Sequence, residues 1–267
     1  MTFDMNRAWD EAVRMLKTNR ELVLILAGLF FFLPVFAIGI FVPEIITGPS
    51  LSGATSIEQA AQIIADYNAR IGHWSFLIRL AELIGMLSIL ALFARRRLTV
   101  AQAIGTGAKA LIPFVIAAFF FLLSSSALGG LLVSILGYAG LLLVFILMLF
   151  AIARLTPLPS LLVAESRFNP FAAIADSWRM TGKSGWKILG FLLLIILAYV
   201  IVSFVVGGII LLATALISNV EAANLIAAAL AALVNAFWLS LLMAILMAIY
   251  RQLNASGSAA GIPRTHS

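Results

Sequence analysis

The chain has 267 residues, of which 63% are hydrophobic and only 10% are charged. A soluble domain of this size cannot bury so much apolar surface in one core, so the composition predicts an integral membrane protein. The net charge of +6 does not indicate nucleic acid binding, because the basic residues lie beside apolar runs, and the absence of cysteine excludes disulfides and thiolate metal sites.

The first 43 residues predict an interfacial helix followed by a membrane span. Basic residues occupy the other faces of a helix over residues 2–20 whose apolar positions are Met5, Ala8, Trp9, Ala12, Val13 and Leu16. The uncharged run from Leu22 to Pro43 is long enough to cross a ~30 Å hydrocarbon layer at ~1.5 Å per residue. Pro34 removes a backbone donor and is expected to bend this span.

Residues 44–75 predict a short surface helix on the outer side of the membrane. Turn formers are followed by the capping-box pattern Ser56-Ile-Glu-Gln59 and by apolar residues at helical spacing. The second span is predicted from Phe76 to Ala94, and three consecutive arginines at 95–97 end it.

The next segment predicts an amphipathic element and two further spans. Thr99 is a candidate cap for the amphipathic element, in which Gly105 and Gly107 argue against a regular helix. The 44 residues from Ala110 to Ala153 carry no charge. As one helix they would be about 66 Å long, roughly twice the bilayer core, so we expect two spans with a turn between residues 124 and 140.

The stretch from Arg154 to Lys187 is the longest polar interruption in the second half of the chain. Pro157 and Pro159 are expected to break the end of the fourth helix. Asn169 before a proline predicts the start of a third interfacial helix, because Asn caps helices and proline suits their first turn.

The remaining residues predict two more spans and a tail. The fifth span covers 188–217 and the sixth 225–250, where alanines repeat every four residues and permit close packing in lipid. Residues 1–253 are therefore predicted to form one all-α domain with six transmembrane helices, and residues 254–267 a disordered cytoplasmic tail. An interfacial helix precedes each transmembrane hairpin, which indicates either an internal repeat or a topology with cytoplasmic elbows.

Basic residues predict the orientation. With six spans both termini lie on one side, and that side would hold 15 of the 17 Lys and Arg residues, all except Arg70 and Arg79. Because cytoplasmic loops carry an excess of Lys and Arg, both termini are predicted to be cytoplasmic.

Several short motifs resemble those of a bacterial membrane family. They are Arg154 after an apolar helix, Leu158-Pro159, an apolar stretch ending in Glu165, Ser177-Trp178-Arg179 with a following Gly-Lys pair, and Tyr250-Arg251-Gln252-Leu253. In this order they are similar to the membrane domain found beside some glycerophosphoryl diester phosphodiesterases and to YciC-type proteins. The resemblance implies a six-helix, multi-pass protein of the bacterial inner membrane, associated with envelope lipids. It implies no catalytic residue, because the phosphodiesterase activity belongs to a separate soluble domain.

Three polar residues inside predicted spans are candidate lipid or substrate contacts. Arg79 and Glu82 are spaced i, i+3 and share a helix face. Inserting an ionisable residue into a membrane costs about 2.5 to 3.5 kcal/mol of free energy, so each is a candidate for function. The alternative is that Arg79 snorkels to the interface and Glu82 only neutralises it. Asn235 lies deep in the sixth span, where an interhelical hydrogen bond accounts for it.

Arg154, Arg179 and Lys183 are candidate contacts for anionic phospholipid headgroups, each worth about 1 kcal/mol near a charged leaflet. The alternative is that they only set the topology. The polar residues are too few to assemble a nucleophile, a base and a charge stabiliser into a catalytic site. The two histidines are far apart in sequence, so they do not indicate a metal site. We therefore expect no catalytic residue, metal or cofactor.

Three functions are compatible with these features. The first is a non-enzymatic envelope or scaffold component that interacts with lipid, and the others are a small-solute or lipid transporter or channel and a membrane-embedded lipid enzyme. Substrate-dependent flux would favour a transporter, whereas turnover that depends on Glu82 would favour an enzyme. Protein partners and the oligomeric state stay open.

Overall fold

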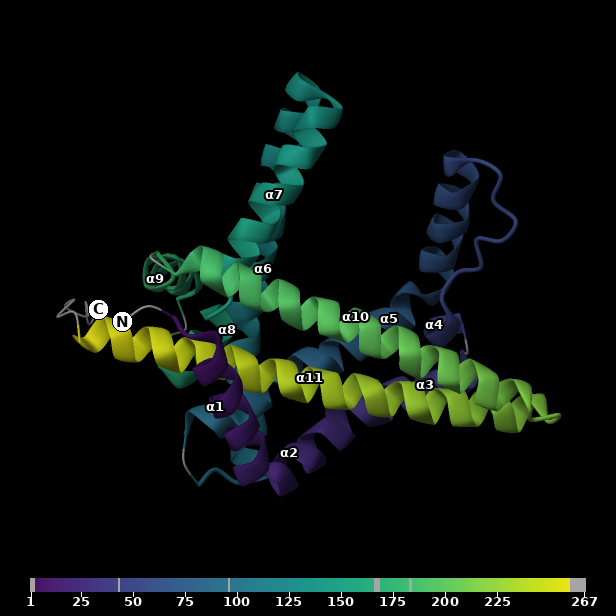
Figure 1. Ribbon diagram of the computed structural model, residues 1–267, viewed down its shortest axis with the longest axis horizontal. Coiled ribbons are helices and arrows are strands. Elements are labelled where there is room, and N and C mark those ends of the chain that lie inside the picture. Colours follow the sequence, from purple (N-terminus) through teal and green to yellow (C-terminus); the bar gives the residue numbers. More distant parts are fainter. Residues whose placement is uncertain (1–2, 43, 96, 166–168, 183, 260–267) are drawn as a thin grey trace.

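The computed structural model describes residues 3–42, 44–95, 97–165, 169–182 and 184–259, and these ranges contain helices and no strand (Figure 1). The elements are α1 (Met5–Thr18), α2 (Arg20–Ala27), η1 (Gly28–Phe32), α3 (Leu33–Phe41), α4 (Glu44–Thr47), α5 (Ile57–Ala94), α6 (Val100–Leu136), α7 (Tyr138–Leu155), α8 (Leu158–Ala164), α9 (Pro170–Met180), α10 (Gly185–Ala215) and α11 (Val220–Ala259).

Within the described residues, six helical stretches are long and apolar enough to cross a membrane, as the sequence predicts. They are Arg20–Phe41, Ile57–Ala94, Val100–Leu136, Tyr138–Ala164, Gly185–Ala215 and Glu221–Ser256. The first is composite, because the π-helical turn η1 joins α2 to α3. Pro34 is the second residue of α3, and the wider turn of η1 before it accommodates a proline that would otherwise crowd the carbonyl of Phe30.

The predicted surface helix and second span form one helix, α5. It begins as expected at Ser56, whose hydroxyl accepts a hydrogen bond from the backbone N–H of Gln59. The Gln59 side chain accepts from the backbone N–H of Thr55. Residues 57–75 contain no proline and only one glycine, Gly72, so no helix-stop signal separates the two parts.

The predicted amphipathic element after Thr99 is likewise not a separate helix, which corrects the pattern of one interfacial helix before each hairpin. Thr99 and Gln102 form a capping box, and α6 then continues to Leu136. The turn to α7 lies at Gly137, inside the predicted window, where a φ of 57° favours glycine.

At Gly107 the helix α6 packs closely against α5, and this contact requires a residue without a side chain. A Cβ at Gly107 would lie 2.6 Å from the Oγ and 2.7 Å from the backbone N of Ser88, whereas no neighbouring element comes within 4 Å at Gly105. We expect Gly107→Ala to destabilise the protein by about 1–3 kcal/mol through overpacking, since backbone atoms cannot move aside. Gly105→Ala is the matched control. If the unfolding temperature in detergent fell by the same amount in both variants, this packing would be contradicted.

The starts of α9 and α11 have asparagine caps. Asn169 Oδ1 accepts from the backbone N–H groups of Phe171 and Ala172, as predicted. Asn219 does the same at the start of α11. At its other end α11 continues to Ala259, so residues 254–259 of the predicted disordered tail are helical, while residues 260–267 lie outside the described part. Gln252 and Leu253 are buried, which anchors this last stretch of helix.

Most of the core lies at the end of the molecule where α1 begins and α11 ends (Figure 1), and the core continues into α2 and η1 through Leu26 and Phe31. We call this end the base. It comprises α1, α8, α9, the N-terminal parts of α6 and α10, and the C-terminal parts of α5, α7 and α11. Its fully buried side chains include Leu90, Leu161, Ile188, Met243 and Ile249. Burial on this scale makes the base the part of the fold with the largest apolar contribution to stability.

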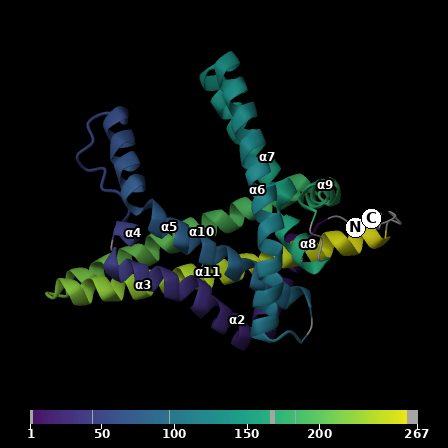
Figure 2. The same cartoon turned by 180° about the vertical axis from the view of Figure 1, so that it is seen from behind.

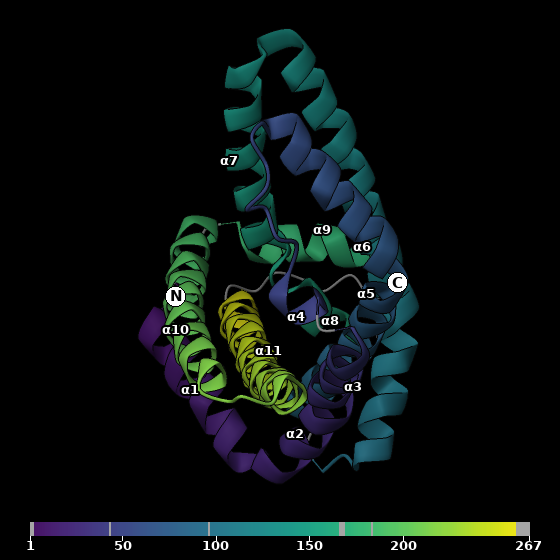
Figure 3. The same cartoon turned by 90° about the vertical axis from the view of Figure 1, so that its right-hand side faces the viewer.

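Away from the base the two hairpins α6–α7 and α10–α11 separate (Figure 2). In Figure 3 the α10–α11 pair is seen nearly end-on, while α6–α7 extends along the vertical of the view. Among the described residues of α6 none after Ala117 is buried, and on α10 none after Ile195. The exposed side chains are large and apolar, as on Phe119 and Phe204, which suits a hydrocarbon surrounding.

Candidate functional site

Arg79, Glu82 and Asn235 meet between α5 and α11, and we call them the polar cluster. Glu82 is only 4% exposed. Arg79 Nη1 donates to Glu82 Oε2 at 2.5 Å, and Asn235 Nδ2 donates to Glu82 Oε1 at 3.0 Å. Each carboxylate oxygen thus has a donor, which satisfies a buried charge. The predicted i, i+3 pair and the predicted interhelical hydrogen bond are confirmed.

This cluster lies far from the base along both helices. At ~1.5 Å per residue, Arg79 is about 22 Å from Ala94, the last residue of α5. Asn235 is about 22 Å from Tyr250 on α11 by the same measure. A hydrocarbon layer of ~30 Å beginning at the base would therefore place the cluster in its far third.

Arg79 and Glu82 differ sharply in exposure. The Arg79 side chain is 74% exposed, whereas that of Glu82 is 6% exposed. Among the described residues, Glu82 is the one hydrogen-bond partner of the Arg79 guanidinium. Arginine carries five N–H donors, so most of those on the exposed Arg79 side chain are available to an external acceptor.

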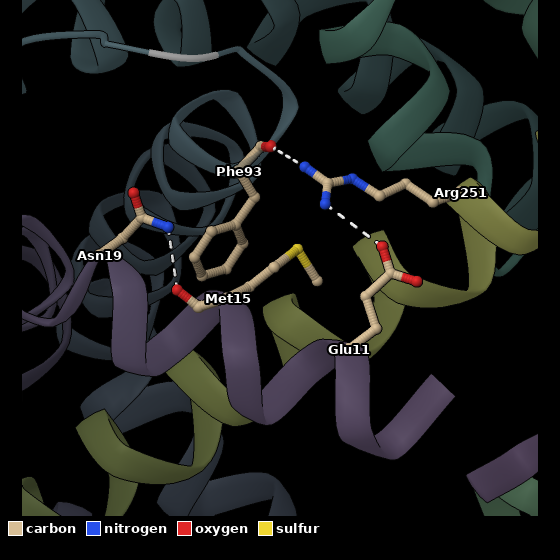
Figure 4. Close-up of polar contacts among 5 residues, drawn as sticks. All are labelled: Glu11, Met15, Asn19, Phe93 and Arg251. Atoms are coloured by element: carbon tan, nitrogen blue, oxygen red, sulfur yellow. Dashed lines mark hydrogen bonds and ion pairs between the residues drawn. The ribbon is translucent and has the colours of Figure 1, made fainter. Parts of the chain in front are cut away.

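Arg251 connects three elements of the base (Figure 4). Its Nη1 donates to Glu11 Oε1 of α1 at 3.2 Å, and its Nη2 donates to the Phe93 carbonyl near the end of α5 at 2.5 Å. Close by, Asn19 Nδ2 donates to the Met15 carbonyl and closes the end of α1 (Figure 4). One guanidinium therefore joins α11 to α1 and satisfies a helix-terminal carbonyl of α5.

The residues on either side of Arg251 make further long-range contacts. Tyr250 Oη donates to Glu165 Oε1 at 3.1 Å. Gln252 Nε2 donates to the Asp4 carbonyl, and its Oε1 accepts from the Asp4 N–H, each at 3.2 Å. These residues belong to Tyr250-Arg251-Gln252-Leu253, one of the motifs that carry the family resemblance. Their structural role follows from contacts made across the whole chain, and no local pattern predicts them.

Arg154 links α7 to α9 instead of presenting a free cation. Its Nη1 donates to the Trp178 carbonyl at 3.2 Å, and its guanidinium lies 5.1 Å from the Phe150 ring and 5.0 Å from the Trp178 ring. The Arg154 carbonyl accepts from Ser177 Oγ at 2.9 Å. These contacts hold α9 against the end of α7.

The other two candidate headgroup contacts are Arg179 and Lys183. Arg179 pairs with Asp176 of its own helix at 2.7 Å, and its side chain is 54% exposed. Lys183 lies outside the described residues. Arg154 and Arg179 both belong to the base, but their contacts within the protein differ: the first connects two helices and the second stays within one turn.

This difference gives a test on α9. We expect Arg154→Leu to remove about 1–2 kcal/mol of local stability, because a charge-assisted hydrogen bond and two cation–π contacts are lost. Amide hydrogen exchange of residues 170–180 should accelerate about tenfold. Arg179→Ala is the control, since an exposed pair within one helix is worth about 0–1 kcal/mol. Equal acceleration in both variants would disprove the linking role of Arg154.

Within the described ranges, no group of three or more His, Asp or Glu side chains is placed to hold a metal ion. No model of a protein family, no curated protein and no solved structure matches the chain.

Proposed function

We propose that this protein is a non-enzymatic, multi-pass component of the bacterial inner membrane that binds lipid as part of an envelope or scaffold function. The observation that carries the proposal is Arg79, a cation that is 74% exposed on an apolar helix and anchored from behind by buried Glu82. An exposed cation at a depth where hydrocarbon is expected requires a polar partner, and lipid headgroups are the nearest source.

Two features support an orientation with the base in the cytoplasm. The polar face of α1 exposes Arg7, Arg14 and Lys17, while Ala8 and Ala12 of the same helix are buried against the bundle. The positive-inside rule gives the same side for both termini. In this proposal α1 and α9 lie at the membrane interface, and the α10–α11 hairpin extends from the base into the bilayer.

The family resemblance supports the same proposal. The motifs similar to the membrane domain beside glycerophosphoryl diester phosphodiesterases all fall in the base: Arg154, Glu165, Ser177, Trp178 and the tripeptide at 250–252. In the proposed function these residues keep the base assembled, and lipid contacts are made elsewhere.

Native mass spectrometry of the protein released from lipid nanodiscs tests the proposal. We expect one or a few lipid molecules to remain bound at collision energies that remove the bulk lipid. A smooth distribution of lipid adducts that follows only the composition of the nanodisc would contradict specific lipid binding.

A transporter is the second candidate, and Glu82 is the observation that favours it. A carboxylate that is only 4% exposed and hydrogen-bonded to a second span resembles the ionisable sites along substrate pathways. Substrate-dependent flux into proteoliposomes that is lost in Glu82→Gln would support this candidate over the first.

A further inference from the structure

We infer that Arg79 binds the phosphodiester group of a phospholipid in the leaflet opposite the base, and that Glu82 and Asn235 position its guanidinium. The inference rests on the proposed lipid binding and adds the chemical class and the place of the ligand. Three observations support it: the hydrogen bonds of the cluster, its depth, and the contrast with the Arg70–Glu44 pair.

The cluster holds the guanidinium in one place. Glu82 accepts one N–H of Arg79 and is itself fixed by Asn235 from α11. Because Glu82 is buried, it cannot follow Arg79 into the headgroup region, so it acts as an anchor behind the cation. A side chain ordered in advance loses less conformational entropy on binding, which favours a specific ligand over transient contacts.

Arg79 lies closer to the headgroups of the far leaflet than to those on the side of the base. Trp74 lies on α5 about 30 Å from Ala94 at ~1.5 Å per residue, which is the thickness of a hydrocarbon core. The rings of His73 and Trp74 are 4.9 Å apart, an aromatic pair of the kind found at membrane interfaces. Arg79 is about 8 Å deeper by the same measure, so a phosphate that meets its Glu82-bound guanidinium lies below the ordinary headgroup level of that leaflet.

The chemistry of the guanidinium selects the phosphodiester among the groups present at this level. The planar fork of arginine binds two oxygens of one phosphate at once, whereas an acyl ester offers a single carbonyl acceptor. The pair with Glu82 leaves the cluster without net charge, so binding depends on hydrogen-bond geometry more than on long-range attraction. A zwitterionic or an anionic phospholipid therefore suits the site.

Arg70 and Glu44 provide a matched control on the same side of the molecule. Their ion pair measures 2.8 Å, but the two side chains are 65% and 48% exposed. This pair has no buried carboxylate and no partner from a neighbouring span among the described residues. It therefore carries the same charges as Arg79 and Glu82 without the anchoring that the inference requires.

The test uses the full chain in nanodiscs that contain phosphatidylethanolamine, phosphatidylglycerol and diacylglycerol at known mole fractions. Native mass spectrometry of the wild type should show one retained phospholipid and no retained diacylglycerol. Arg79→Ala/Glu82→Gln, which leaves no buried unpaired charge, should reduce retention about tenfold or more, as expected for lost charge-assisted hydrogen bonds. Glu82→Ala keeps the cation without its anchor and should reduce retention severalfold, whereas Arg70→Ala should match the wild type.

The possible outcomes distinguish a failure of the Arg79 site from a failure of the proposed lipid binding. Undiminished retention in Arg79→Ala/Glu82→Gln would overturn the site while leaving lipid binding intact. Retention of diacylglycerol equal to that of phospholipid would overturn the role of the phosphodiester. Equal loss in Arg70→Ala would reduce the effect to surface charge and also overturn the site. A wild-type protein that retains no lipid would overturn both the inference and the proposed function.

Discussion

Arg251→Ala is expected to lower the free energy of unfolding by about 2–3 kcal/mol and to release α1 from the bundle. The variant removes the hydrogen bonds to Glu11 and to the Phe93 carbonyl, and hydrogen bonds to charged groups contribute about 1.5–3 kcal/mol each before allowance for exposure. The Glu11 side chain, which is 16% exposed in the intact protein, loses its cation. Unfolding by SDS titration from mixed micelles measures the total, and hydrogen exchange of residues 5–18 measures the release of α1.

Arg14→Ala is the matched control for that experiment. Arg14 is an exposed arginine of α1, so its removal changes the net charge of the base by the same amount. We expect a change within about 0.5 kcal/mol, as for most surface substitutions. If Arg251→Ala destabilises the protein no more than Arg14→Ala does, the connection between α11, α1 and α5 is not important for stability.

Local signals in the sequence predicted the parts of the fold that depend on a few neighbouring residues. Thr99, Asn169 and Ser56 are helix caps in the structure, because a side-chain oxygen and an N–H two or three residues later suffice to form a cap. Six apolar stretches gave six candidate spans for the same reason, since length and composition decide whether a helix can cross a bilayer.

Helix continuity was predicted less well. Gly105 and Gly107 argued for an interruption, yet α6 runs through both. A glycine inside a helix costs about 1 kcal/mol, and close packing of α6 on α5 at Gly107 offsets that cost. The packing partner, Ser88, belongs to another helix, so the sequence around Gly107 does not show that the space is needed.

The contacts of the candidate site were also predictable only where they are local in sequence. The Arg79–Glu82 pair was predictable from i, i+3 spacing, whereas the partner of Asn235 was not, because Glu82 is 153 residues away. The contacts of Arg251 span 240 and 158 residues and have no sequence signature at all. The sequence presents Arg154 as a headgroup contact or a topology-setting charge and Arg251 as one of the basic residues that set the topology. The structure shows that both also connect helices within the base.

Arg79→Ala is expected to destabilise the protein by about 3 kcal/mol, much more than Glu82→Gln. Removing Arg79 leaves the Glu82 carboxylate, which is 4% exposed, without its cation, and breaking a buried ion pair from one side costs about 3–5 kcal/mol. Because Arg79 itself is largely exposed, the lower end of that range applies. SDS titration from mixed micelles, with Arg70→Ala as the control for an exposed pair, measures this cost.

Glu82→Gln separates charge from shape in the same cluster. The amide keeps a carbonyl that can accept from Arg79 or Asn235, and the exposed Arg79 keeps its access to headgroups or water, so we expect a change below about 1 kcal/mol. Arg79→Ala/Glu82→Gln should then regain most of the stability that Arg79→Ala loses, because no buried charge remains. A double variant as unstable as Arg79→Ala alone would mean that the arginine contributes by packing its long side chain, and that neutralising Glu82 is not its role.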